Sequence, residues 1–236
     1  MGRGGRYARS GIGGAVNGVF ITMEGVEGSG KSTQILRLSE RLRRLGVPLV
    51  ASKEPGGTTL GLELRRLLLT RHSSGDQWCP DAELLLFYAD RAQHLAQLIR
   101  PSLAAGKVVL LDRFEDSTRA YQGALGVPES TLDRLSDLIV GRNRPHLTIL
   151  LDMDPEASLV RVDTRNLDLG ESFKETRYDE AALAFHRLVR SRFLAIHQRE
   201  PNRLRVVPAR ISPDEVERRI WLHVAPLLRN AGMRVE

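Results

Sequence analysis

The feature that most constrains this chain is residues 25–32, whose sequence GVEGSGKS fits the pattern G-x-x-x-x-G-K-[ST]. A β-branched run precedes the motif, and a Leu- and Arg-rich stretch with helical periodicity follows it. Between a strand and a helix, such glycines let successive backbone N–H groups turn toward phosphate oxygens, and the helix presents its positive end to them. The motif therefore predicts a loop that binds the phosphates of a nucleoside triphosphate.

Short β-branched runs alternate with longer helical periods along the rest of the chain, which is typical of βαβ units on a parallel sheet. Strands are expected at residues 19–24, 48–53, 108–112, 147–152 and 204–208. Helices are expected at residues 32–45, 61–69, 81–105, 130–140, 155–165, 177–199 and 213–228. The pattern predicts an α/β fold with a five-stranded parallel sheet flanked by helices, in which ligands bind beyond the carboxyl ends of the strands.

Composition narrows the classes of protein to which this chain can belong. Its 236 residues are 42% hydrophobic and 27% charged, and no apolar run approaches the roughly 18 residues that span a bilayer. The single cysteine, Cys79, cannot form an intrachain disulfide, and the six histidines show no metal-ligand spacing. We expect a soluble cytoplasmic protein with no membrane partner and no structural zinc site.

The net charge of +6 fits either a nucleic-acid surface or an attraction for small phosphorylated ligands. The arginines are spread among acidic residues without interleaved aromatic residues, so we expect solvated helix faces and no nucleic-acid partner. Residues 1–17 are rich in Gly and Arg and contain no acid, which predicts a flexible tail outside the fold. Residues 18–230 are expected to form one domain, followed by a C-terminal tail at residues 231–236.

Chemically useful side chains follow the second and third expected strands. Glu54 stands beside a Pro-Gly-Gly turn that is also typical of a plain strand-to-helix connection, and Arg65 in the next helix could reach a phosphate. Asp112 and Arg113 end the third strand, where an acid can hold Mg²⁺ or its water and an arginine can grip a phosphoryl group through two hydrogen bonds. The alternative for these two residues is a surface ion pair that closes the strand.

Two residue pairs share a helix face at i, i+4 spacing. Phe87 and Arg91 could stack on a nucleobase and hydrogen-bond to it, although a core phenylalanine and a solvated arginine are the plain alternative. Arg161 and Arg165 lead into a polar segment and would suit a lid over a transferring phosphate, unless they are solvent-facing charges. Residues 117–123 carry polar and aromatic groups able to recognise a base or a sugar.

Taken together, these segments resemble the thymidylate kinase family over residues 19–220. The resemblance rests on segments in a specific order: EGVEGSGKST, EPGGT, LLFYADRAQH, DR-x-x-x-ST-x-AYQG and LLDMDPE. It implies a three-layer P-loop NTP hydrolase fold with a short mobile lid at about residues 161–177. It also implies phosphorylation of dTMP to dTDP with MgATP, a step of dTTP biosynthesis, by a homodimer packed through long helices, for which residues 81–105 are a candidate.

The resemblance also assigns site residues by position. It implies that the ATP phosphates are bound by Gly25, Val26, Glu27, Gly28, Ser29, Gly30, Lys31, Ser32 and Thr33. It implies that dTMP is bound by Glu27, Glu54, Pro55, Arg65, Phe87, Arg91, Arg113, Ser117, Tyr121 and Gln122. The implied Mg²⁺ site, partly reached through water, consists of Ser32 and Asp112. The implied catalytic residues are Lys31, Asp112, Arg113, Arg161 and Arg165.

Some of these implied roles are specific. Glu27 would contact the 3′-hydroxyl of the acceptor sugar, and Tyr121 would crowd the space that a ribose 2′-hydroxyl needs. Phe87 would stack on thymine, and Arg91 would hydrogen-bond to the carbonyl edge of the base.

The family carries its transition-state arginine either in the phosphate loop or in the lid. Residues 26–29 (VEGS) contain no cation, so the lid form is implied. Arg165 is the first candidate and Arg161 the second. Such a cation can contribute about 10³-fold or more in rate, because negative charge moves across the phosphoryl oxygens in the transition state.

The chain departs from the family pattern at Phe114, where Tyr or His is usual, at residues 124–127, which lack a frequent Arg, and at Pro208-Ala209. One phosphate-loop scaffold serves many acceptors, so a kinase for another nucleoside monophosphate is the first alternative. A non-catalytic nucleotide-dependent binding protein is the second. A guanine-specific switch would usually carry N-K-x-D, and the sequence has no such element.

Overall fold

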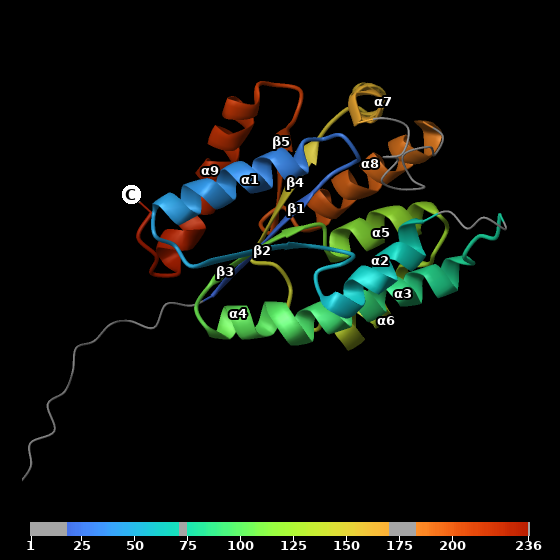
Figure 1. The fold of residues 1–236 in the computed structure, drawn as a ribbon, viewed down its shortest axis with the longest axis horizontal. Helices are drawn as coiled ribbons and strands as arrows, with labels where there is room; N and C mark the ends of the chain where they lie inside the picture. Colours follow the sequence, from blue (N-terminus) through green and yellow to red (C-terminus); the bar gives the residue numbers. More distant parts are fainter. Residues whose placement is uncertain (1–17, 71–74, 170–182, 236) are drawn as a thin grey trace, which may run out of the picture.

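A five-stranded parallel sheet forms the centre of the computed structural model, which describes residues 18–70, 75–169 and 183–235. The strands are β1 (Val19–Glu24), β2 (Leu49–Lys53), β3 (Val108–Asp112), β4 (Leu147–Asp152) and β5 (Leu204–Pro208), in the spatial order β2-β3-β1-β4-β5. Each neighbouring pair is parallel, so the carboxyl ends lie along one edge (Figure 1). Strands β3 and β2 lie on one side of β1, and strands β4 and β5 lie on the other, so the direction of the strand order changes at β1. Ligands bind at such a switch point in sheets of this kind.

Helices cover both faces of the sheet (Figure 1). Their bounds are α1 (Lys31–Arg44), α2 (Thr59–Leu69), α3 (Pro80–His94), the π-helix η1 (Leu95–Ile99), α4 (Arg100–Ala104), α5 (Glu115–Ala124), α6 (Glu129–Ile139), α7 (Pro155–Leu169), α8 (Leu183–Arg199) and α9 (Pro213–Asn230). Alternate residues of the central strands join different clusters: Ile21 and Leu110 pack with residues of α1 and α9, whereas Phe20 and Val109 pack with Leu95. Burial on both faces explains why these strands are nearly continuous apolar runs.

The strands lie where the sequence predicts them, except that β2 begins at Leu49 rather than at residue 48. The helix expected at residues 81–105 is divided into α3, η1 and α4. Pro101 lies in the first turn of α4, where its missing N–H cannot continue the helical hydrogen bonding. The other expected helices are present with shifted ends, and the one expected at residues 177–199 is described from Leu183 onward.

Helix α5 is present although the sequence pattern did not predict a helix there. Its buried residues are largely polar, among them Asp116, Thr118 and Gln122. A helix that buries polar side chains lacks the apolar stripe on which recognition of helical periodicity depends. Residues 117–123, expected only as a recognition segment, therefore belong to a helix that faces the interior.

The segment after α9, expected as a C-terminal tail, packs on the fold instead. Met233 and Val235 are buried in the main core, and the Met233 N–H donates to the Leu228 carbonyl at 3.0 Å. The predicted N-terminal tail at residues 1–17 and the part of the predicted lid at residues 170–177 lie outside the described residues. None of the described helices combines the length and the apolar composition that crossing a bilayer requires.

Candidate active site

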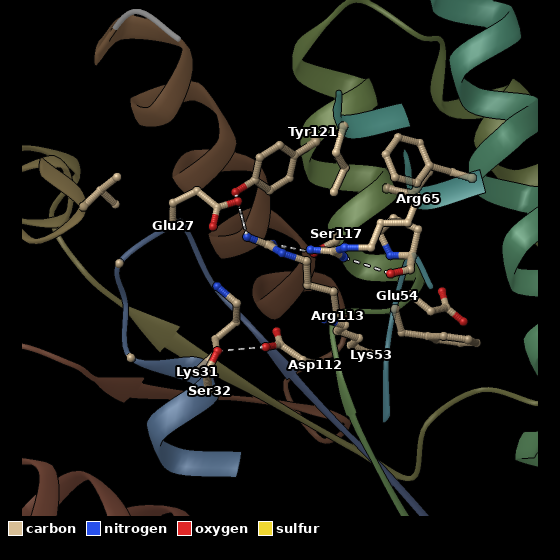
Figure 2. A pocket seen from close by; sticks show the side chains of 18 of the residues that line it. Glu27, Lys31, Ser32, Lys53, Glu54, Arg65, Asp112, Arg113, Ser117 and Tyr121 are labelled. Atoms are coloured by element: carbon tan, nitrogen blue, oxygen red, sulfur yellow. Dashed lines mark hydrogen bonds and ion pairs between the residues drawn. The ribbon is translucent and has the colours of Figure 1, made fainter. Parts of the chain in front are cut away.

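A cavity of about 440 Å³ lies at the carboxyl ends of β1, β2 and β3, bordered by α2, α3, α5 and α7 (Figure 2). The predicted site residues that line it are Glu27, Gly28, Gly30, Lys31, Ser32, Thr33, Glu54, Pro55, Arg65, Phe87, Arg91, Asp112, Arg113, Ser117, Tyr121, Gln122 and Arg161. The predicted residues Gly25, Val26 and Ser29 are not in this lining. Arg165 lies on α7, and its side chain is outside the described part of the structure.

Further residues line the cavity that were not singled out individually from the sequence: Lys53, Leu69, Phe114, Thr118 and Val162. Lys53 is the last residue of β2 and stands in register with Asp112 of β3. Lys53 could have been predicted from the sequence, because the carboxyl ends of neighbouring parallel strands lie side by side and ligands bind beyond them. Thr118 belongs to the segment 117–123 that was expected to recognise a base or a sugar, but its contact with Arg91, 27 positions away, had no local signal.

The loop after β1 is held in part by its own lysine. Lys31 is buried, and its Nζ donates to the carbonyl oxygens of Gly25 at 3.1 Å and Val26 at 3.0 Å. Burial, followed by the nearby Arg113, lowers the pKa of Lys31. Helix α1 begins at this residue, so the positive end of the helix and the ammonium group lie on the same wall of the cavity.

Helix α7 packs directly on the phosphate loop at Gly28. This glycine has a φ of +70°, and a methyl group there would lie 2.6 Å from the Ser158 carbonyl oxygen. The Ser158 hydroxyl donates in turn to the Glu27 carbonyl. The contact brings Arg161, further along α7, to the edge of the cavity, where its Nη1 lies 3.5 Å from the Ala209 carbonyl oxygen.

Asp112 ends β3 between Met23 of β1 and Lys53 of β2. The Ser32 hydroxyl donates to Asp112 Oδ2 at 3.3 Å, whereas Asp112 Oδ1 is buried and has no hydrogen-bond partner among the described residues (Figure 2). A hydroxyl and a carboxylate are oxygen ligands of the kind that Mg²⁺ prefers. The described residues contain no group of three or more His, Cys, Asp or Glu that could hold a metal ion.

Arg113 adopts a left-handed backbone conformation directly after β3, with a φ of 67°. Its guanidinium donates to the Gly25 carbonyl at 3.1 Å and to Ser117 Oγ at 2.9 Å. It also donates to Glu27 Oε1 at 2.7 Å and to the Tyr121 hydroxyl at 3.2 Å (Figure 2). One cation therefore joins the phosphate loop to α5.

Glu24 supports the turn that contains Arg113. It is buried at the end of β1 and accepts hydrogen bonds from the Phe114 N–H at 2.8 Å and the Ser117 hydroxyl at 2.5 Å. Burial, followed by the nearby Asp116, raises the pKa of Glu24 to about 7. Glu24 was not predicted as a site residue, although its place at the end of a strand was a signal for it.

Arg91 is only 2% exposed and lines the cavity. Its Nε donates to Glu54 Oε2 at 2.9 Å, and its Nη2 donates to Thr118 Oγ1 at 3.0 Å. Its guanidinium carbon lies 5.0 Å and 5.1 Å from the ring centres of Tyr88 and Phe114, respectively. Arg91 is therefore not a solvated charge, because a carboxylate and aromatic rings surround it in the interior.

The other predicted residues of the cavity are also held by neighbours. Arg65 donates through Nη1 to the Pro55 carbonyl at 2.9 Å, and Gln122 donates through Nε2 to Glu83 Oε1 at 2.8 Å. Phe87 is half-buried and packs against the main core from the cavity wall. The residues that the sequence singled out on separate elements thus meet around one cavity.

A phosphate loop joined through Arg113 to a cavity with a buried arginine and an aromatic ring defines this chain as a nucleotide kinase of the P-loop class. Comparison with known proteins narrows the class. Residues 23–220 match the model of the family described as thymidylate kinase. The chain belongs to the thymidylate kinase family, as its motifs indicated.

Named relatives cover nearly the whole chain. The thymidylate kinase of Syntrophotalea carbinolica is 46% identical over 214 residues, which cover 90% of this chain and 98% of that protein. The thymidylate kinase of Solidesulfovibrio magneticus is 44% identical over 211 residues, which cover 89% of this chain and 100% of that protein. The crystal structure of thymidylate kinase from Ehrlichia chaffeensis is 33% identical, with a TM-score of 0.67, and covers 89% of this chain and 98% of that chain. The predicted fold class is confirmed.

Proposed function

We propose that this chain transfers the γ-phosphoryl group of ATP to the 5′-phosphate of dTMP, which yields ADP and dTDP for dTTP synthesis. The observation that carries the proposal is the Arg113 guanidinium, which contacts the phosphate loop and α5 at once. Membership of the family and the names of the relatives also support it. In the transfer, the bond from the γ-phosphorus to the β–γ bridging oxygen breaks, and a bond forms to an oxygen of the acceptor phosphate.

On the donor side, the phosphate loop supplies positive charge and backbone donors. Lys31 would contact the β- and γ-phosphates, and the first turn of α1 would direct N–H groups at them. Because the acceptor phosphate is already ionised, no strong general base is required, and positioning and charge neutralisation supply most of the rate.

A magnesium site at Ser32 and Asp112 fits the residues present. The support is the buried Asp112 Oδ1, which has no hydrogen-bond partner in the described part of the chain, beside the Ser32 hydroxyl. Bound Mg²⁺ would neutralise negative charge on the phosphate oxygens. Asp112 and Ser32 would hold the ion at the end of β3.

On the acceptor side, the side chains around the cavity match a nucleoside monophosphate. Arg65 and Arg113 would grip its phosphate, Phe87 would stack on thymine, and Arg91 would donate to the carbonyl edge of the base. The remaining contacts would come from Glu27, Glu54, Pro55, Ser117, Tyr121 and Gln122. Arg91 Nη1 supports this assignment, because it is buried without a hydrogen-bond partner among the described residues.

The transition-state cation would come from α7. Residues 26–29 offer no cation, whereas Arg161 lines the cavity and Arg165 follows at i+4 on the same helix. We propose Arg165 as the first candidate and Arg161 as the second, each able to stabilise the charge that spreads over the transferring phosphoryl group.

The chain would act as a homodimer through α2, α3 and α6. Helix α3 packs on both of the others, and these helices carry exposed leucines, which are Leu60, Leu62, Leu67, Leu85 and Leu138. Exposed apolar side chains on neighbouring helices are typical of an interaction surface. Sedimentation equilibrium should give twice the chain mass of 26.3 kDa, and Leu85→Arg should lower it to the single chain mass. A monomeric wild type would refute the dimer.

An acceptor panel tests the proposed reaction. ADP release is followed in a coupled assay with ATP and, separately, dTMP, dUMP, UMP, CMP, GMP and AMP. We expect kcat/KM to be highest for dTMP. A higher kcat/KM for another monophosphate would make that monophosphate the substrate in place of dTMP. If no monophosphate of the panel led to ADP release, the chain would be a nucleotide-dependent binding protein.

A further inference from the structure

The last turn of α3 holds the turn that follows β2. His94 is fully buried, with its Nδ1 3.0 Å from Glu54 Oε1 and its Nε2 3.0 Å from Ser52 Oγ. Asp90, one turn earlier, accepts a hydrogen bond from the Gly56 N–H at 3.0 Å. The ligand contacts proposed for this helix are made by Phe87 and Arg91, and His94 has none.

Glu54 divides its carboxylate between His94 and Arg91. Glu54 Oε1 faces His94, and Glu54 Oε2 accepts from Arg91 Nε at 2.9 Å. A neutral imidazole with its proton on Nδ1 satisfies both of its contacts, because it donates to Glu54 and accepts from the Ser52 hydroxyl. Since a carboxylate is planar, holding Oε1 also sets the direction from which Oε2 accepts.

This geometry decides which nitrogen of Arg91 is left for a ligand. Nε is used by Glu54, and Nη2 donates to Thr118 Oγ1 at 3.0 Å. Nη1 is buried and has no hydrogen-bond partner among the described residues. A buried donor without an acceptor is costly, so a ligand oxygen that reaches it through the cavity gains more than an exposed hydrogen bond would give.

We propose that His94 is a positioning residue for recognition of the acceptor base, because it holds Glu54 in the orientation that directs Arg91 Nη1 at a base carbonyl. The inference rests on the proposed function, in which that carbonyl belongs to thymine. Close packing supports it: a methyl group on Gly57 would lie 2.3 Å from His94 Nε2, so the ring lies against the backbone of the turn. His94 acts through Glu54 and does not touch the substrate.

The test compares steady-state kinetics of the full-length wild type and two His94 variants. His94→Leu removes both hydrogen bonds, and the KM for dTMP should rise about tenfold, whereas the KM for ATP should not change. The preference for dTMP over dCMP, as a ratio of kcat/KM, should fall as well, because cytosine carries an amino group where thymine offers a carbonyl. His94→Asn places an N–H near the position of Nδ1 and should return the KM for dTMP to within about threefold of wild type.

His197→Leu is the matched control. His197 is a half-buried histidine of α8 whose Nδ1 lies 2.8 Å from the Leu204 carbonyl oxygen, and it does not line the cavity. Its loss should lower thermal stability without changing the KM for dTMP. A KM for dTMP that is the same in His94→Leu and His197→Leu would overturn the inference.

A second arm separates positioning from general damage. In an Arg91→Gln background, His94→Leu should add little to the KM for dTMP, because the path through Arg91 is already lost. Independent, additive effects would contradict the proposal. If His94→Leu does not fold, Ser52→Ala removes only the hydroxyl on Nε2 and should still raise this KM by about threefold, and an unchanged KM would overturn the inference. A wild type inactive on dTMP would instead refute the proposed function.

Discussion

Arg113 Nη2 lies 2.7 Å from Glu27 Oε1, although 86 positions separate the two residues in the chain. Both side chains are less than one-fifth exposed, and the pair connects the phosphate loop with the end of β3. A partly buried pair with further hydrogen bonds holds its groups in a defined geometry before a ligand arrives. The site is therefore organised by a contact that only the fold creates.

Arg113→Ala should lower kcat/KM for dTMP by about 10²-fold or more, because it removes the positive charge proposed to grip the acceptor phosphate and the guanidinium that pairs with Glu27. Arg66→Ala is the control, since Arg66 is an exposed α2 arginine that pairs with Glu63 and does not line the cavity. Circular dichroism would verify that both variants fold. Near-normal turnover of dTMP by Arg113→Ala would contradict the role given to this residue.

Asp112→Asn should raise the Mg²⁺ concentration needed for half-maximal rate by about tenfold, because a neutral amide is a weaker ligand than a carboxylate. The measurement is the initial rate at saturating ATP and dTMP as Mg²⁺ is titrated. Asp133→Asn is the control, since Asp133 carries an ion pair to Arg119 away from the cavity. Identical Mg²⁺ dependence in the Asp112 variant and wild type would argue against a metal at Asp112.

Arg165→Ala should reduce kcat by about 10³-fold if that side chain stabilises the transferring phosphoryl group, with a smaller loss for Arg161→Ala. The KM values for ATP and dTMP should change little, because the interaction would strengthen only in the transition state. Arg229→Ala on α9 provides an exposed control. A larger loss in Arg161→Ala would reverse the order of the two candidates, and no loss in either would exclude both.

Most of the sheet could be predicted because its strands are apolar runs that differ clearly from the segments between them. The motif residues at the strand ends could be predicted as neighbours, since parallel strands present their carboxyl ends on one edge. Helix α5 could not be predicted from the sequence pattern, because it buries Asp116 and Gln122 rather than an apolar stripe. Local periodicity carries no information about polar residues that find their partners in other elements.

The contact partners of the buried polar side chains in the site could not be predicted from neighbouring residues in the sequence. Arg91 on its own resembles a solvated charge, and it is buried because Glu54, 37 positions earlier, compensates its charge. His94 similarly meets Ser52, 42 positions away. Such contacts depend on how α3 packs against the turn after β2, and residue types and spacing within one segment do not encode that packing.

Gly28→Ala should destabilise the protein more than Gly46→Ala, although both glycines have a φ of +70°. At Gly46 nothing lies within 4 Å of an added methyl group, so only backbone strain of about 1 kcal/mol is expected. At Gly28 the methyl group would also collide with the Ser158 carbonyl and push α7 away from the loop, so the KM for ATP should rise as well. Equal unfolding free energies for the two variants would show that α7 does not press on the loop.

Glu24→Gln should change how stability depends on pH. Burial raises the pKa of Glu24 to about 7 in the folded protein, whereas the ordinary value is 4.5. The folded state therefore binds a proton more tightly than the unfolded state, and the wild-type free energy of unfolding falls as pH rises from 4.5 to about 7. Glutamine does not titrate, so the free energy of unfolding of the variant should rise relative to that of the wild type by up to about 3 kcal/mol between pH 4.5 and about pH 7. Urea denaturation at about pH 4.5 and pH 7.5 measures the difference, with the exposed Glu63→Gln as control. A difference between variant and wild type that stays constant with pH would show that Glu24 ionises normally in the fold.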